Sequence, residues 1–381
     1  MILSDEVLSW FDAHQKEAFD LLVELAQIPA PSNQEEKRVE FVKAWLEKQG
    51  AKGVFIDDAL NVVYPIGVTE SNDVAVYMAH SDVVFPDLTP LPLRIEDGKI
   101  HCPGVGDDTA NAVALLMTAK YIAENDLQPA GRGVVLVINS GEEGLGNLRG
   151  SRKIMETYGQ RVKEFVTFDA MSLRIADTSV GSHRYKVEID TEGGHSYGAF
   201  GNRNAIRYLA SMIDALYAVK VPEKPGAKTT YNVGLISGGT SVNTIAQRAE
   251  MLYEYRSDDV ECLLAMKRCF EAVVEAYRAM GIGVEVELVG ERGCARDVDE
   301  SAHAALIGMA QRSVRDIIGA DPGLESSSTD ANSALNAGVP AICMSAVAGR
   351  GCHTREEELD LDSLVTGCRL TMDFMANYFT P

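Results

Sequence analysis

Residues 73–84 read DVAVYMAHSDVV, and residues 133–144 read GVVLVINSGEEG. Each stretch is a short apolar run that ends in acidic or histidine side chains, and EFVTFDA (164–170) repeats the pattern. Apolar runs of this length are typical of strands buried on both faces, as in parallel sheets. A helix-like segment, 109–125, separates the first two runs. The alternation predicts an α/β fold in which a mostly parallel sheet is flanked by helices.

A different pattern occupies the middle of the chain. Four strand-like segments occur there, at 184–190, 229–237, 249–256 and 283–289, with helix-like segments at 203–218 and 260–280. The order β-α-β-β-α-β is typical of a ferredoxin-like unit. We therefore expect residues 179–293 to form a second domain, inserted into a main domain of residues 1–178 and 294–381. The main domain would also contain helices at 5–27, 33–49, 301–318 and 361–379 and a strand at 340–346.

The composition is that of a globular protein without a basic binding surface. Of the 381 residues, 46% are hydrophobic and 24% are charged, and the formal net charge is −21, which argues against nucleic-acid binding. No apolar run approaches the roughly 20 residues that a membrane helix needs, and the N-terminal residues do not resemble a secretory signal. The seven cysteines include no CxxC pair, which favours free thiols in a reducing cytoplasm.

Residues that can do chemistry follow each predicted strand. His80 and Asp82 come after the first strand, Glu142 and Glu143 after the second, and Asp169 after the third. Ligand sites in open α/β sheets gather at the carboxyl ends of the strands. Residues two apart on an extended chain point the same way, so Asp82 could accept the second ring N–H of a metal-bound His80.

Two further segments add to this group. Asp107 and Asp108 open a helix in PGVGDDTAN (103–111), where an ordinary N-terminal capping pair is the structural alternative. His353 follows the last predicted strand, in GRGCHTREEE (349–358). Gathered at one sheet edge, the carboxylates would repel one another unless a cation were present. Two divalent metal ions, bound by histidine and carboxylate, would resolve that repulsion.

In the order and spacing of these motifs, the chain resembles the zinc-dependent exopeptidases that include peptidase T, acetylornithine deacetylase and succinyl-diaminopimelate desuccinylase. The resemblance covers nearly the whole chain, including the inserted domain. It implies that His80 and Asp169 bind one zinc ion, that Glu143 and His353 bind the other, and that Asp107 bridges both. Cobalt or manganese would suit the same ligands.

The resemblance also implies roles outside the ligand set. Asp82 would orient His80, Glu142 would act as general base, and Asp330 in STDANSALNAGVPAI (328–342) would pack near the site. The inserted domain would be a lid that also makes a homodimer contact. It carries three residues that would hold the substrate: His195 in GGHSYGAFGNRNAI (193–206), Asn243 in GGTSVNTIA (238–246) and Arg256 in YEYRS (253–257). His195 would contact the oxyanion, and Arg256 suits a carboxylate.

These features predict a cytoplasmic enzyme that hydrolyses amide bonds in small peptides. Thr109 stands where the family often has lysine, and the turn after His195 lacks the family's frequent proline. The sequence of that turn is closer to peptidase T, which favours an aminopeptidase or tripeptidase. The alternative is an N-acyl amino-acid deacylase or carboxypeptidase with the same site. A catalytically silent relative fits less well because Glu142 is present, and a phosphatase fits less well because no basic phosphate clamp is visible.

Overall fold

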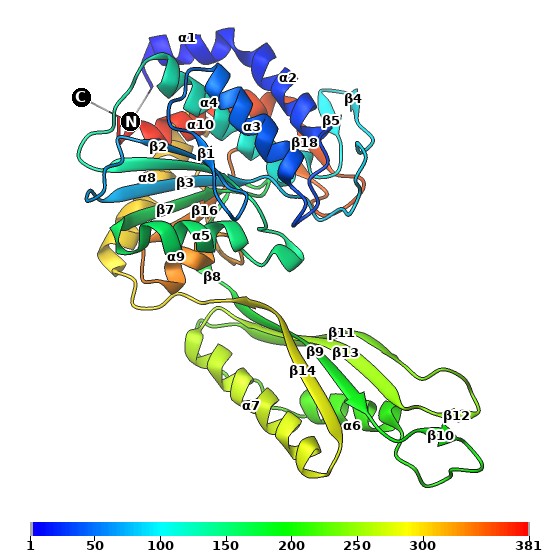
Figure 1. The fold of residues 1–381 in the computed structure, drawn as a ribbon. Helices are drawn as coiled ribbons and strands as arrows, with labels where there is room; N and C mark the ends of the chain where they lie inside the picture. Colours follow the sequence, from blue (N-terminus) through cyan, green and yellow to red (C-terminus); the bar gives the residue numbers. More distant parts are fainter. Residues whose placement is uncertain (1–2, 380–381) are drawn as a thin grey trace. The chain divides into compact units, whose positions relative to one another are not determined.

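The computed structural model describes residues 3–379, which divide into two compact units (Figure 1). Unit 1 consists of the chain up to Ser179 and from Arg296 onward, and unit 2 is Val180–Ala295. The chain therefore leaves unit 1 once, forms unit 2, and returns. Each unit has its own cluster of buried hydrophobic residues.

Unit 1 is built around an eight-stranded mixed sheet with the strand order β1-β2-β6-β3-β7-β16-β8-β15. The strands are β1 (Phe55–Ile56), β2 (Val62–Ile66), β3 (Val74–His80), β6 (Gly133–Asn139), β7 (Val162–Phe168), β8 (Arg174–Ser179), β15 (Gly323–Ser327) and β16 (Ala341–Met344). The four neighbours β6, β3, β7 and β16 are parallel, whereas β2 and β8 run antiparallel to this group. Every residue of β3 and β6 is buried, as their apolar runs predict.

Helices cover both faces of this sheet, which confirms the predicted α/β class. They are α1 (Asp5–Ala13), α2 (Gln15–Ala26), α3 (Glu36–Lys48), α4 (Asn111–Glu124), α5 (Arg149–Tyr158), α8 (Glu300–Ile318), α9 (Ala331–Asn336) and α10 (Leu361–Ala376). In Figure 1, α1–α4 and α10 lie on one face, and α5 and α9 lie on the other. Helix α4 is buried from Asn111 to Ile122. This burial agrees with its sequence, which has apolar residues on nearly every side of the helix.

A small second sheet in unit 1 joins two distant segments. It has the order β17-β18-β5-β4, with β4 (Arg94–Glu96), β5 (Lys99–His101), β17 (Gly349–Arg350) and β18 (Glu358–Asp360). The antiparallel register pairs Glu358 with His101. This pairing brings the segment around His353 beside the loop that begins after β5.

Several elements differ from the sequence prediction. The single helix expected over 5–27 is two helices, because the backbone leaves the helical region at His14. The helix expected from 109 begins at Asn111, and Asp107 and Asp108 lie instead in a π-helical turn, η1 (Val105–Ala110), with non-helical backbone angles at both residues. Strands β1, β2, β8 and β15 were not predicted; β15 is the sequence GLESS, which has no buried position.

Unit 2 is a four-stranded antiparallel sheet with two helices packed on one face. Its elements are β9 (Gly181–Asp190), α6 (Ala205–Tyr217), β11 (Thr229–Gly238), β13 (Arg248–Ser257), α7 (Val260–Ala279) and β14 (Gly283–Arg292), with the strand order β11-β13-β9-β14. Tyr185, Tyr253 and Phe270 stack in its core. A separate two-stranded ladder pairs β10 (Gly194–His195) with β12 (Thr244–Ile245).

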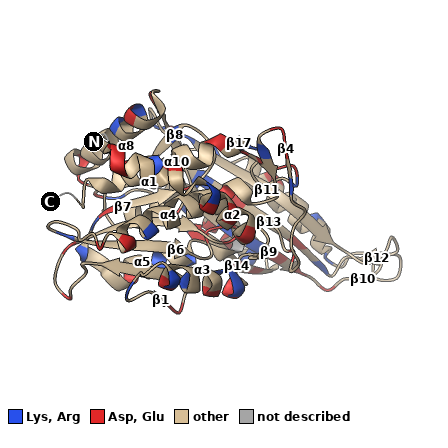
Figure 2. Ribbon diagram, turned by 90° about the horizontal axis from the view of Figure 1, so that it is seen from above, with Lys and Arg blue, Asp and Glu red and all other residues tan. Residues whose placement is uncertain are grey.

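In the view of Figure 2, acidic and basic residues are interspersed over the helices of unit 1. Among the described residues, no helix is both long enough and apolar enough to cross a membrane.

Asn61 is fully buried and joins three segments of unit 1. Its Nδ2 donates to Gly150 O at 3.1 Å and to Asp57 Oδ2 at 2.8 Å, and its Oδ1 accepts the N–H of Ser140 at 3.2 Å. We expect Asn61→Ala to lower the free energy of unfolding by about 1–3 kcal/mol, because a buried N–H then loses its partner. Urea unfolding followed by the fluorescence of the two tryptophans, both in unit 1, measures the change.

Tyr77→Phe is the matched control for this experiment. Tyr77 is also fully buried in unit 1, and its hydroxyl has no hydrogen-bond partner among residues 3–379. Removing the hydroxyl leaves no group unsatisfied, so we expect a change below about 0.5 kcal/mol. Equal losses of stability in the two variants would contradict the contacts described for Asn61.

Candidate metal centre

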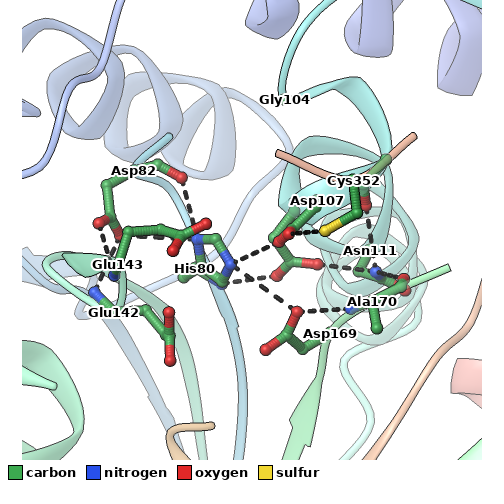
Figure 3. A network of polar contacts seen from close by, with 12 residues as sticks. His80, Asp82, Gly104, Asp107, Asn111, Glu142, Glu143, Asp169, Ala170 and Cys352 are labelled. Atoms are coloured by element: carbon green, nitrogen blue, oxygen red, sulfur yellow. Dashed lines mark hydrogen bonds and ion pairs between the residues drawn. The ribbon is translucent and has the colours of Figure 1, made fainter. Parts of the chain in front are cut away.

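The carboxyl ends of β6, β3, β7 and β16 meet at one edge of the large sheet, and the predicted polar residues lie there (Figure 3). His80, the last residue of β3, is in register with Asn139, the last residue of β6. Residues that follow these strands therefore emerge side by side. The structure brings together all of the unit 1 candidates for ligand or catalytic residue: His80, Asp82, Asp107, Glu142, Glu143, Asp169 and His353.

Asp107 lies in the middle of this group. Its Oδ1 is 3.0 Å from His80 Nε2, and its Oδ2 is 3.1 Å from His353 Nε2. His80 Nε2 is also 3.8 Å from Asp169 Oδ1, and His353 Nε2 is 2.9 Å from Glu143 Oε1. Asp107 thus joins two sets of donor atoms, one formed with His80 and Asp169 and the other with Glu143 and His353.

Negative charge is concentrated in a place with little solvent. Six acidic residues at this edge are buried, each with at most 8% of the residue exposed: Asp82, Asp107, Asp108, Glu142, Glu143 and Asp169. Burial, together with the negative charge of Asp107, raises the pKa of Asp169 to about 7. Burial acts in the same direction on Asp107, but hydrogen bonds with His353 and His80 outweigh it and lower the pKa of Asp107. A cation beside Asp169 would favour its ionised form.

The donor atoms suit divalent transition metals. Carboxylate oxygen and imidazole nitrogen are both zinc ligands, and catalytic zinc sites commonly have three protein ligands and an open position. Each set around Asp107 offers one histidine and one further carboxylate. The donor atoms of His80, Asp107 and Glu143 lie within 4.8 Å of one another, as do those of His80, Asp108 and Asp169, so the residues present fit divalent metal.

Asp82 forms hydrogen bonds with two parts of the site, the ring of His80 and the backbone of Glu142 and Glu143. His80 Nδ1 lies 3.0 Å from the backbone oxygen of Asp82 and 3.5 Å from its carboxylate Oδ1, so the hydrogen bond goes to the backbone. This contact leaves Nε2 facing Asp107. The Asp82 carboxylate accepts the backbone N–H groups of Glu142 and Glu143, each at 3.0 Å, and the hydroxyl of Ser32 at 2.7 Å. Asp82 thereby positions the glutamate pair, which the sequence did not indicate.

Glu357 belongs to the site but was not predicted from the sequence. It is 1% exposed, and its carboxylate accepts the N–H groups of Gly104, Gly106 and Asp107 at 2.9, 2.8 and 3.0 Å. The pairing of β18 with β5 places it opposite the loop that carries Asp107. A run of three glutamates normally indicates a solvated surface, so the sequence gives no signal for this role of Glu357.

Other buried polar residues form hydrogen bonds with the segments that carry the site. Asn111 donates to Asp108 Oδ1 at 2.7 Å and to the backbone oxygen of Ala170 at 2.8 Å, which ties η1 to the turn after β7. Asp108 in turn accepts the backbone N–H of His80 at 2.7 Å. Asp330, as predicted, lies close by: it is fully buried and accepts a hydrogen bond from Asn139 at 2.6 Å.

The three candidates in unit 2 divide into two places. His195 lies in β10, and the N–H of its neighbour Ser196 donates to the backbone oxygen of Asn243 at 2.9 Å, so His195 and Asn243 lie together. Arg256 lies in β13 and forms an ion pair with Glu254 at 3.0 Å. It is opposite Ser182, at the end of the sheet where the chain joins unit 2. Strands rise by about 3.3 Å per residue, so the length of β13 separates Arg256 from the β10–β12 ladder.

Comparison with known proteins identifies a family. The sequence model for peptidase family M20/M25/M40 matches residues 76–377. Acetylornithine deacetylase from Myxococcus xanthus is 27% identical over 237 residues, which cover 57% of this chain and 60% of that protein. The structure is similar to aminopeptidase PepT from Bacillus cereus (22% identity, 94% and 97% of the two chains covered, TM-score 0.71). It is also similar to a tripeptidase from Staphylococcus aureus (21% identity, 94% and 97% covered, TM-score 0.73).

The role of Glu357 can be tested by removing one of its two acceptor oxygens. In Glu357→Gln an amide NH₂ would face at least one backbone N–H, so the loop carrying Asp107 would shift. We expect the affinity for divalent metal to fall by about 10- to 100-fold while the circular dichroism spectrum is unchanged. Titration with zinc against a chromophoric chelator measures the affinity. Glu356→Gln, at the exposed neighbouring position, is the control, and equal affinities in the two variants would refute the positioning role.

Proposed function

Because the chain belongs to peptidase family M20/M25/M40, we propose that it hydrolyses amide bonds in small peptides at the centre around Asp107. The chain is an enzyme of the metallopeptidase and amidohydrolase kind. The observation that carries the proposal is that the two oxygens of Asp107 face His80 and His353 separately. A carboxylate in this arrangement suits a bridge between two divalent cations.

We assign His80 and Asp169 to one cation, Glu143 and His353 to the other, and Asp107 to both. Zinc is the expected metal, with cobalt and manganese as alternatives that suit the same ligands. Cations bound there polarise the scissile carbonyl and increase the acidity of a water molecule. Asp82 keeps the ring of His80 in the orientation that ligation requires.

Glu142 is the proposed general base. It is 5% exposed and adjoins the ligand Glu143, and its backbone is fixed by Asp82. Its carboxylate takes a proton from the attacking water and gives it to the leaving amine nitrogen. The glutamate pair thus divides the labour, with one side chain binding metal and the other moving the proton.

We further propose that unit 2 supplies the substrate contacts. Nδ1 of His195 accepts the N–H groups of Tyr197 and Gly198, both at 3.3 Å, so the ring proton of the neutral histidine lies on Nε2. That N–H can donate to the oxyanion of the tetrahedral intermediate. Asn243 lies beside it, and the guanidinium of Arg256 suits a substrate carboxylate.

A homodimer is the proposed assembly. Within residues 3–379, β11 pairs only with β13, so its other edge is a template for a second copy. Leu235 and Ile236 on this strand are about half exposed, at 47% and 53%. Burial of such side chains favours association through unit 2. We place the enzyme in the cytoplasm, where its seven free cysteines would stay reduced.

The proposed substrates are unblocked di- and tripeptides, in line with the aminopeptidase and tripeptidase structures of the same fold. N-acylated amino acids are the second candidate, favoured by the 27% identity to an acetylornithine deacetylase. The two classes differ in whether the substrate has a free α-amine. They use the same ligand set and general base.

A substrate panel separates these classes. We expect hydrolysis of unblocked di- and tripeptides, no hydrolysis of N-acetyl or N-succinyl amino acids, loss of activity with a chelator and recovery with zinc. Release of free amino acids is the measurement. Hydrolysis of blocked substrates alone would establish the deacylase function instead. A protein that binds metal and cleaves neither class would refute the proposed activity.

The division of labour between the two glutamates gives a further expectation. Glu142→Gln should retain metal and lower kcat by about 10²–10⁴-fold, because only proton transfer is lost. Glu143→Gln should lower metal content as well, because a ligand is lost. Metal analysis and kcat are measured on the same samples. A normal kcat in Glu142→Gln would contradict the assignment of Glu142 as the general base.

A further inference from the structure

Two consecutive side chains, Cys352 and His353, converge on one oxygen atom. The thiol of Cys352 donates to Asp107 Oδ2 with a separation of 2.6 Å, and His353 Nε2 is 3.1 Å from the same oxygen. Neighbouring side chains on an extended chain point in opposite directions. Here His353 has φ 62°, in the left-handed region that residues with a β-carbon rarely adopt. A conformation of this kind persists where the surroundings demand it, and it often marks a functional site.

The proposed reaction uses His353 and Asp107 but leaves the thiol without a role. Sγ of Cys352, a nitrogen of His353 and a carboxylate oxygen of Asp107 all lie within 4.8 Å of one another, as they would around one cation. No other cysteine among the described residues belongs to such a group. The side chain of Cys352 is also exposed, so packing in a hydrophobic core does not explain it.

We propose that Cys352 is an additional ligand of the cation held by Glu143 and His353, and that its sulfur makes this position selective for zinc over manganese. The inference rests on the proposed function, which places a cation there. On ligation the Sγ–H bond breaks, the proton is released to solvent, and the thiolate binds the metal. Asp107 Oδ2 then exchanges the thiol hydrogen bond for the cation.

The chemistry of the four ligands supports the selectivity. Thiolate is a soft ligand that favours zinc and related metals, whereas manganese prefers carboxylate and water. Zinc accepts sulfur, nitrogen and oxygen together and can bind five ligands as well as four, so a thiolate still leaves room for a water molecule. No cysteine among the described residues groups in this way with His80 and Asp169, because the thiol of Cys343 lies near the backbone oxygen of Asp169 and not among those donor atoms.

Cobalt(II) gives a direct test, because cobalt bound to thiolate has a sulfur-to-metal charge-transfer absorption in the near ultraviolet that oxygen and nitrogen ligands do not produce. We expect this band in the cobalt-loaded protein, its loss in Cys352→Ser, and its retention in Cys269→Ser. Cys269, in α7 of unit 2, is partly exposed and is the matched control. A cobalt-loaded protein without the band, or a band that survives in Cys352→Ser, overturns the proposal.

Metal competition provides a second readout. Cys352→Ser should lower zinc affinity by about 10- to 100-fold and manganese affinity by less than about threefold. Equal losses for both metals overturn the selectivity. The proposed function fails independently of this inference: peptide hydrolysis without the band refutes the cysteine ligand alone, and the band without hydrolysis refutes the peptidase activity alone.

Discussion

Asp107 meets a histidine at each of its two carboxylate oxygens, and the arrangement of the site depends on keeping that side chain in place. Asp107 comes from η1, so no ladder of the large sheet fixes its backbone. The register between β18 and β5 instead brings Glu357 to the amides around it. The position of one carboxylate is therefore set by another that comes 250 residues later in the chain.

Burial of the central strands affects both the middle of the sheet and the charged residues at its edge. β3 and β6 are buried at every position, which keeps water away from the middle of the sheet. Where these strands end, the lack of water strengthens both repulsion among carboxylates and their attraction to cations. The raised pKa of Asp169 reflects its burial first and then this repulsion, chiefly from Asp107. The same environment would make a bound cation strongly polarising toward a carbonyl group.

The strand-borne part of the site is predictable from the sequence because parallel strands buried on both faces are continuous apolar runs, and the residues after them share one edge. His80, Glu143 and Asp169 are found in this way. Glu357 and Asn111 are not, because their partners include backbone groups far away in the chain. β8 (RIADTS) and β15 (GLESS) lack an apolar run, so pairing within the sheet and not local sequence determines them. The roles of His195, Asn243 and Arg256 stay predictions.

The way unit 2 is connected has an evolutionary consequence. Its first strand, β9, and its last strand, β14, pair antiparallel, with Ser182 opposite Arg292, so the two points where the chain joins unit 2 are neighbours. Neighbouring ends allow an insertion to be gained, exchanged or shortened without changing the order of the strands on either side of it. Descendants of one ancestral gene can therefore recombine new modules at this junction. Substrate preference can diversify in this way while the ligand-bearing sheet is inherited unchanged.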